Sequence, residues 1–182
     1  MPSPDPNIIE HTLPLDHVIP LKKQKLRRMK PKLSKKIEEE VMKLLKIDFI
    51  EVTHYADWIA NIVLVMKKGG GVRVCVDYHN LNKVSPKDDF PLLHIDVLVD
   101  NMAGFELFSF IDGFSGYNRI RMKEEDKTKT SFIAPWGTFY YKVMPFGLKN
   151  VGATYQRATA TLFHDIMHKE IEVYFDNMLA KS

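Results

Sequence analysis

The segments LFSFIDGFSGY, residues 107–117, and IEVYFDNMLAKS, residues 171–182, decide the fold of this chain. Each begins as a short apolar strand and reaches an acidic residue, Asp112 in the first and Asp176 in the second. An acid after a strand is most often a turn former or a helix cap. Two such acids on neighbouring strands of one sheet would instead be placed to hold divalent cations for phosphoryl transfer. Both interpretations are open from these segments alone.

Around these strands the chain alternates helical and extended patterns. Apolar residues at helical spacing predict a helix over 34–46 with Ser34 as its N-cap, and β-rich runs at 59–66 and 72–78 around KKGGG predict a hairpin. Further patterns predict a helix at 95–102 with Leu98 and Val99 buried, strands within 131–144, a long helix over 152–168 and a terminal strand. Hairpins and separate helices favour the α+β class over a doubly wound sheet.

Length and composition describe an ordinary globular domain. The chain has 182 residues, of which 45% are hydrophobic and 27% charged, so it is long enough to bury a core. The single cysteine, Cys75, cannot form an intrachain disulfide, which favours a reducing, intracellular setting, in the cytoplasm or the nucleus. No apolar run is long enough to span a membrane, and the first residues lack the pattern of a signal peptide.

Positive charge is concentrated in one stretch of the chain. The net charge is only +3, yet residues 17–37 contain no acid and nine cations: Lys22, Lys23, Lys25, Arg27, Arg28, Lys30, Lys32, Lys35 and Lys36. Such a stretch could bind a polyanion through counterion release, or it could be a solvated basic arm leading into a helix. Charge alone leaves both alternatives open.

Longer blocks of the sequence carry a family resemblance. FSFIDGFSGYNRI, VMPFGLKNVGATYQR and VYFDNMLAKS resemble, in order and spacing, the reverse transcriptase of gypsy-type long-terminal-repeat retrotransposons, especially plant elements. GGGVRVCVDYHNLNKV resembles the fingers block of that family. The resemblance implies fingers plus an incomplete ferredoxin-like palm, an antiparallel sheet with packed helices. Residues 1–33 would be a basic extended lead-in, 34–91 a fingers-like subdomain and 92–182 a partial palm, without thumb, ribonuclease H or other Pol segments.

The resemblance also implies a two-metal site and its substrates. Asp112 and Asp176, with the carbonyl of Gly113, would hold Mg²⁺, or Mn²⁺, for RNA-directed DNA synthesis from dNTPs on an RNA or DNA template-primer. Lys67 and Arg73 would reach the triphosphate, and Tyr117 would lie under the sugar, although Tyr117 could equally be an ordinary half-buried tyrosine. Pro145, Phe146 and Gly147 would line the nucleotide pocket next to the template. The other template contacts would be Asp77, Asn82, Gln156 and the basic residues Lys22, Lys23, Lys25, Arg27 and Arg28.

The sequence departs from the family pattern at one catalytic position. The family has Tyr-x-Asp-Asp at the last strand, whereas this chain has Asn177 after Asp176. An amide keeps one oxygen but removes a negative charge beside the expected cations, so weak or absent activity is expected. The alternative is a non-catalytic nucleic-acid-binding remnant that acts through the basic stretch 22–36.

Overall fold

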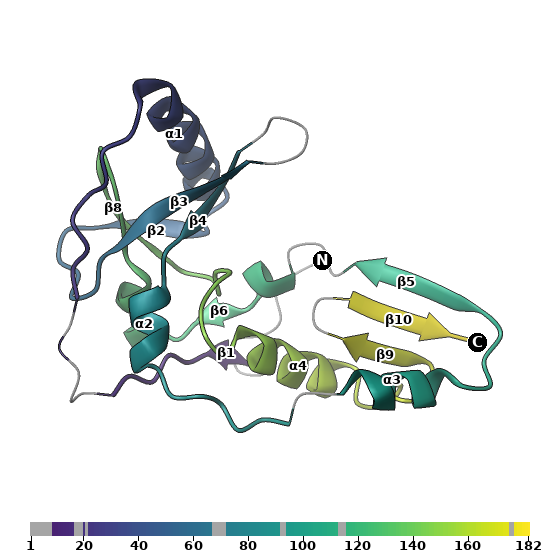
Figure 1. The fold of residues 1–182 in the computed structure, drawn as a ribbon. Helices are drawn as coiled ribbons and strands as arrows, with labels where there is room; N and C mark the ends of the chain where they lie inside the picture. Colours follow the sequence, from purple (N-terminus) through teal and green to yellow (C-terminus); the bar gives the residue numbers. More distant parts are fainter. Residues whose placement is uncertain are drawn as a thin grey trace.

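A computed structural model describes residues 9–16, 20, 22–66, 72–91, 94–112, 116–174 and 177–182. The chain is of the α+β class, as expected. Its described strands form a larger sheet of five strands, a smaller sheet of three strands and one short two-stranded ladder. Figure 1 shows the larger sheet with helix α1 in one part of the molecule and the smaller sheet with helices α3 and α4 in another. The expected Lys67, Gly113 and Asp176 lie outside the described residues, as does the KKGGG turn.

The larger sheet has five strands in the order β2-β8-β7-β3-β4. Its strands are β2 (Ile50–Thr53), β3 (Ala60–Met66), β4 (Val72–Val76), β7 (Phe132–Ala134) and β8 (Gly137–Tyr141). The predicted hairpin is confirmed, because β3 and β4 pair antiparallel with Ile62 opposite Val76. The sheet is mixed rather than wholly antiparallel, since β3 and β7 run parallel. The central strands β7 and β8 come from the segment assigned by sequence to the palm, so the sheets cut across that division.

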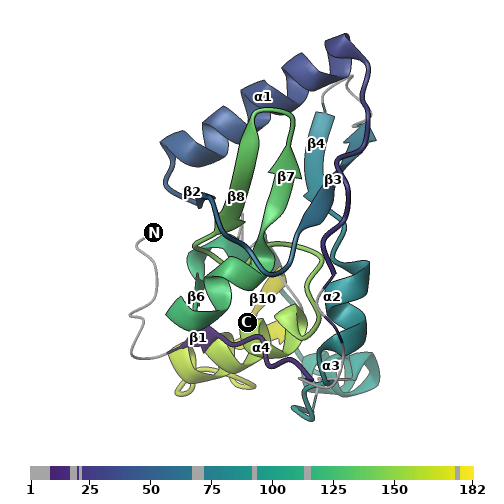
Figure 2. The ribbon, with the colours of Figure 1, turned by 90° about the vertical axis from the view of Figure 1, so that its left-hand side faces the viewer.

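Helix α1 (Pro31–Lys46) covers one face of this sheet (Figure 2). It contacts β4 and β2, and its buried residues Ile37 and Val41 lie four positions apart, on one side of the helix. The helix begins three residues before the predicted start, and Lys30 rather than Ser34 is its N-cap. The reason is Pro31, whose fixed φ and missing N–H suit the first helical position.

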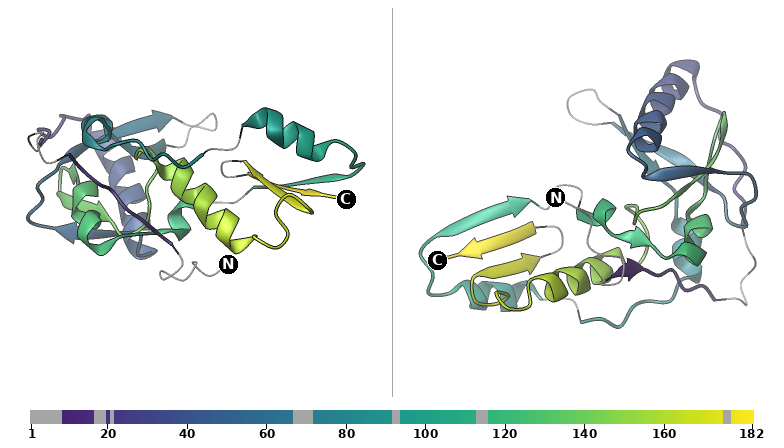
Figure 3. Two further views of the ribbon diagram at one scale, coloured as in Figure 1. Left: turned by 90° about the horizontal axis from the view of Figure 1, so that it is seen from below. Right: turned by 180° about the vertical axis from the view of Figure 1, so that it is seen from behind.

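The smaller sheet has three antiparallel strands in the order β5-β10-β9. These are β5 (Phe108–Asp112), β9 (Ile171–Tyr174) and β10 (Asn177–Lys181). Helices α3 (Ile95–Met102) and α4 (Val151–Leu162) both contact β9, and Figure 3 shows them at that side of the sheet with β5 as the far edge.

Two predictions about these helices were wrong. Helix α4 ends at Leu162 instead of 168, and the hydroxyls of Thr159 and Thr161 bond back to carbonyls of the helix, a pattern that weakens helix ends. Helix α3 has the predicted bounds but no buried residue: Leu98 is half-buried and Val99 is exposed, because within the described residues the helix packs mainly on the edge strand β9.

Shorter elements connect the two sheets. They are β1 (Glu10–His11), which pairs parallel with β6 (Arg121–Met122), helix α2 (His79–Val84), and the 3-10 helices η1 (Gly116–Arg119) and η2 (Glu124–Thr130). One cluster of buried side chains runs from Leu13 and Ile37 through Phe132 to Val173, so the core is continuous through both sheets. Within the described ranges, every helix is too short or too polar to cross a lipid bilayer.

Candidate functional site

The smaller sheet brings two of the expected catalytic positions together. Antiparallel pairing of β5 and β10 places Asn177 directly opposite Asp112, and Asn177 also lies opposite Tyr174 of β9. Residues directly opposite in an antiparallel pair have Cα atoms about 4.5–5.5 Å apart. The ends of these strands therefore form the candidate site, with Asn177 exposed. Among the side chains that the structure describes, no three His, Cys, Asp or Glu residues cluster as a metal site would require.

Three aromatic rings pack against each other around Tyr117, which follows Asp112 by five positions. Tyr117, on η1, is 8% exposed, and its ring centroid is 5.0 Å from both Phe146 and Tyr155. The Phe146 ring meets Tyr117 edge-to-face at 88° and is 53% exposed. Tyr117 is thus more deeply buried than a half-buried strand tyrosine, and Phe146 forms the exposed side of the cluster.

Gly116 makes this arrangement possible. A Cβ at Gly116 would lie 2.7 Å from the Tyr155 hydroxyl and 2.8 Å from its Cε2. Such distances are shorter than any ordinary van der Waals contact, so a larger residue would have to displace the Tyr155 ring. The glycine spacing in GFSGY therefore serves the packing of Tyr155 on η1.

Asn82 was expected at the template, and each of the two polar atoms of its amide binds a backbone group of the protein. Its Nδ2 donates to the Gly147 carbonyl at 2.7 Å, and its Oδ1 accepts from the Lys149 backbone N–H at 2.8 Å. Asn82 therefore holds the loop that carries Pro145 and Phe146. Pro145 itself is buried next to the exposed Phe146.

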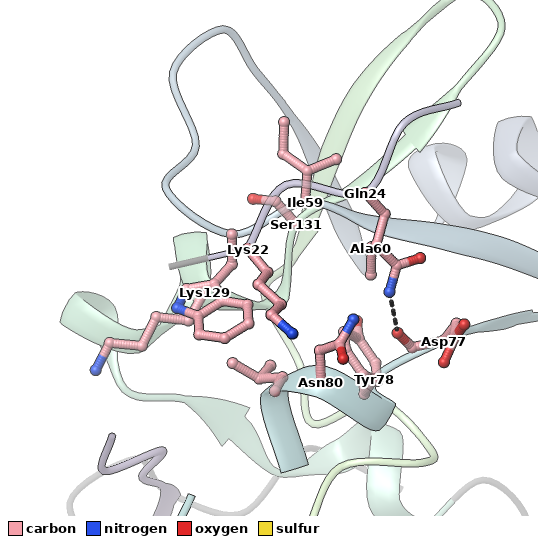
Figure 4. Close-up of a pocket in the computed structure, with 11 residues that line it drawn as sticks. Lys22, Gln24, Ile59, Ala60, Asp77, Tyr78, Asn80, Lys129 and Ser131 are labelled. Carbon is pink, nitrogen blue, oxygen red and sulfur yellow. Dashed lines mark hydrogen bonds between the residues drawn. The ribbon is translucent and has the colours of Figure 1, made fainter. Parts of the chain in front are cut away.

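The basic lead-in lies against the larger sheet in an extended conformation. The Gln24 backbone N–H donates to the Ile59 carbonyl at 2.8 Å, and the Gln24 side chain donates to the Asp77 carbonyl (Figure 4). The Arg27 guanidinium lies 3.0 Å from the Asp77 carboxylate. Asp77 and Arg27 were each expected to contact nucleic acid, and the structure pairs them with each other. The cavity between the lead-in and the sheet measures only about 10 Å³, too small for a nucleotide.

Most of the other basic side chains of the lead-in are accessible to solvent. Lys22, Lys23, Lys25 and Arg28 are exposed, and so is Arg73 on β4. Gln156 is 7% exposed on α4 and lines a separate cavity of about 140 Å³ together with Phe90 and Val173. Arg73 and Gln156 therefore occupy different parts of the molecule.

Asn61 is a residue whose importance the sequence reasoning missed. It is 2% exposed, and its Oδ1 accepts from the Arg27 backbone N–H at 3.0 Å. Its Nδ2 donates to the Gln24 Oε1 and to the Lys25 carbonyl. A polar residue inside an apolar strand must find partners when buried, and that signal was present in the run from Trp58 to Met66.

Two titratable groups near α4 are shifted by their surroundings. Burial lowers the pKa of His11 to about 4, although the charges of Asp126 and Asp88 oppose the change. The His11 Nδ1 lies 2.8 Å from the Thr154 hydroxyl. Partial burial would raise the pKa of Asp88, but hydrogen bonds from the Phe90 backbone and from Arg157 outweigh it and lower that pKa.

The sequence matches one protein family. Residues 65–182 match the family model described as reverse transcriptase (RNA-dependent DNA polymerase). An RNA-directed DNA polymerase homolog from Oenothera berteroana is 33% identical over 108 residues, covering 59% of this chain and 76% of that protein. The retrovirus-related Pol polyprotein from transposon 297 of Drosophila melanogaster is 34% identical over 107 residues, covering 59% of this chain and 10% of the polyprotein. The transposon Tf2-7 polyprotein of Schizosaccharomyces pombe is 34% identical over 121 residues, covering 66% of this chain and 9% of the polyprotein.

Solved structures share the fold over nearly the whole chain. The prototype foamy virus protease-reverse transcriptase superposes with a TM-score of 0.83 at 20% identity, covering 95% of this chain and 23% of that one. The foamy viral protease-reverse transcriptase in complex with an RNA/DNA hybrid gives a TM-score of 0.82 with the same identity and coverage. The chain thus spans about a tenth of the transposon polyproteins and about a quarter of the foamy virus protein.

Proposed function

Because this chain belongs to the reverse transcriptase family, we propose that it is the nucleotidyl-transfer core of a plant gypsy-type retrotransposon, with weak turnover on its own. The observation that carries the proposal is the pairing of Asp112 with Asn177 at the ends of adjacent strands. The ordered family blocks and the relative from Oenothera support the assignment to a plant element.

The donor set suits a hard divalent cation. Asp112, Asp176 and the carbonyl of Gly113 would hold Mg²⁺, or Mn²⁺, because carboxylate and carbonyl oxygens are the ligands these ions prefer. The bound ions would lower the pKa of a primer 3′-hydroxyl and neutralise charge on the triphosphate. Asn177 offers a neutral oxygen where the family has a carboxylate, so the site holds cations less tightly than its relatives do.

The chain's own side chains would bind and orient the substrates. Arg73 is exposed on β4 and can donate to triphosphate oxygens, because a guanidinium presents several N–H groups to a phosphate. Tyr117 and Phe146 would face the sugar of the incoming dNTP, with Gly147 at the turn beside them. Gln156 and the surface around α4 would lie along the template.

Primer extension tests this proposal. Incorporation of dNTPs on a primed homopolymer template should be slow with the wild-type chain and faster with Asn177→Asp, which restores the missing carboxylate. Asp112→Asn should abolish it, and Lys43→Gln, in an exposed ion pair on α1, should leave it unchanged. Absence of incorporation by both the wild type and Asn177→Asp would refute a catalytic role for this chain.

A second function is favoured by the exposed cations of the lead-in. Lys22, Lys23, Lys25 and Arg28 are exposed on a segment that Asn61 fixes in place, so the segment presents four positive charges to solvent. Such a segment would bind RNA or DNA with little sequence preference. Changing the four residues to Gln should reduce the slope of log K against log salt by about 3–4. An unchanged slope would remove this function, whatever the outcome of primer extension.

A further inference from the structure

Asn82 joins helix α2 to the loop after β8. Its Nδ2 donates to the Gly147 carbonyl at 2.7 Å and its Oδ1 accepts from the Lys149 N–H at 2.8 Å. An asparagine amide carries a donor and an acceptor on one planar group, so it can bind two nearby backbone groups at once. Asn82 therefore fixes the loop to α2 at two points, Gly147 and Lys149.

The loop makes its sharp turn between those two bonds. Gly147 has a φ of +93°, a backbone conformation that residues other than glycine rarely adopt. The same line of contacts continues from Lys149 Nζ to the Ser85 carbonyl at 2.6 Å and from Asn150 Nδ2 to the Pro86 carbonyl at 2.9 Å. Residues 147–150 thus follow the position of residues 82–86.

Phe146 stands directly before this fixed turn. Its ring meets Tyr117 edge-to-face, with 5.0 Å between centroids, while the opposite neighbour of Tyr117 is Tyr155. Edge-to-face contacts depend on the relative angle of the rings. Tyr117 is held between two rings, whereas Phe146 is 53% exposed and depends on its loop for its position. Phe146 is therefore the wall that would move if the loop were released.

We propose that Asn82 is a positioning residue for sugar selection: it holds Phe146 against Tyr117 and so determines how strictly the pocket separates deoxyribose from ribose. The proposal rests on the proposed function, because it takes these two rings as the surroundings of the incoming sugar. A ribose differs by one hydroxyl, so a small displacement of one wall is enough to admit it. Both polar atoms of Asn82 are used by the loop, which separates this role from the template contact expected from the sequence.

The test compares binding of two nucleotides that differ only in the 2′-hydroxyl. The full chain, loaded with a primer-template whose primer ends in a dideoxynucleotide, is titrated with dUTP and with UTP in the presence of Mg²⁺. Asn82→Leu removes both bonds, and Asn82→Asp keeps the acceptor for Lys149 while losing the donor to Gly147. Asn80→Leu is the matched control, because Asn80 lies on the same helix and makes no side-chain hydrogen bond within the described residues.

We expect the preference for dUTP to fall about tenfold in Asn82→Leu, by a smaller factor in Asn82→Asp, and not at all in Asn80→Leu. Hydrogen exchange of the Lys149 amide should also accelerate about tenfold or more in Asn82→Leu, since that amide loses its acceptor. This second measurement needs neither turnover nor nucleotide.

The outcomes separate the two proposals. If the wild-type chain binds neither nucleotide, the proposed function fails and this inference fails with it. If the wild type prefers dUTP and both Asn82 variants keep the same ratio, the inference alone is overturned. A uniform loss of affinity for both nucleotides would assign Asn82 a purely structural role and also overturn it. If Asn82→Leu does not fold, the ratio of dUTP affinity to UTP affinity in Asn82→Asp decides: a lower ratio than in the wild type supports the inference, and an unchanged ratio overturns it.

Discussion

Lys181 and Glu172 form an ion pair inside the protein, with 2.9 Å between Nζ and Oε1 and side chains exposed by 1% and 0%. The Lys181 ammonium also donates to the carbonyls of Asn101 at 2.6 Å and His168 at 3.1 Å. The second oxygen of Glu172 lies 2.9 Å from the His168 Nδ1. One buried pair therefore connects β9 and β10, the two strands of the hairpin that carries Asn177, and joins them to the end of α3.

The pair should be costly to break from one side. Removing one partner of a buried ion pair typically lowers stability by about 3–5 kcal/mol, because the other charge stays buried without compensation. We expect Lys181→Met to lower the free energy of unfolding by this amount in urea denaturation at pH 7. The double variant Lys181→Met, Glu172→Leu should recover most of it. Lys43→Met, at the exposed pair with Glu40, should change stability by less than about 1 kcal/mol.

Stability should fall as the pH is lowered through the range set by His11. Its pKa is about 4 in the folded chain and about 6.5 when unfolded, so the unfolded state binds a proton first. The contribution of His11 is complete above pH 6.5 and decreases as the pH falls towards 4, by about 3 kcal/mol in total. Unfolding curves of the wild type and His11→Gln at several pH values between 7 and 4.5 will show it. Parallel pH profiles for the two proteins would argue against this assignment.

Gly116→Ala should disturb the aromatic cluster. The added Cβ would lie 2.7 Å from the Tyr155 hydroxyl, and Tyr155 is 6% exposed and cannot move into solvent without opening the core. Overpacking of this kind costs about 1–3 kcal/mol. Gly137→Ala is the control, since its Cβ would meet nothing closer than 3.5 Å. Thermal unfolding of the two variants side by side measures the difference, and equal melting temperatures would contradict the expected clash.

Asn61→Ala should release the basic lead-in. The variant loses the side-chain bonds to the backbone of Arg27 and Lys25 and to the Gln24 amide. Trypsin should then cut after the lysines and arginines of residues 22–28 faster than in the wild type, whereas Asn80→Ala should be cut at the wild-type rate. Mass spectrometry of the first products identifies the sites. First cuts at other positions would show that the lead-in is held by other contacts.

The sequence predicted the elements that have local signals and missed those that depend on distant partners. The hairpin of β3 and β4 and the bounds of α3 follow from apolar spacing and turn residues. The burial of Val99 was wrong because a helix pattern cannot say how much of its apolar side the rest of the fold covers. The insertion of β7 and β8 between β2 and β3 is set by pairing across long sequence distances, which local patterns do not encode.

In the candidate site, too, local patterns predicted some features, while others depend on residues far away in the sequence. The apolar runs predicted strands at Asp112 and at the segment that contains Asn177, but they left open whether these strands are neighbours, and the structure pairs Asp112 with Asn177. The roles of Asn82 and Asn61 depend on backbone groups 65 and 36 positions away, respectively, which no spacing rule predicts. Residue type alone shows that an amide needs partners but does not show where they lie.

The strand order of the larger sheet also constrains how the protein is made. Among the strands that the structure describes, β2 pairs with β8, and β8 is joined to β3 through β7, so the sheet stays incomplete until residue 141 has been synthesised. Contacts across such sequence distances form slowly, because a long loop must close first. On the ribosome, α1 and the β3–β4 hairpin would emerge before β7 and β8, so the apolar residues of the hairpin would stay exposed until those strands are synthesised. Nascent chains of this protein are therefore expected to need chaperone protection until β8 has left the exit tunnel.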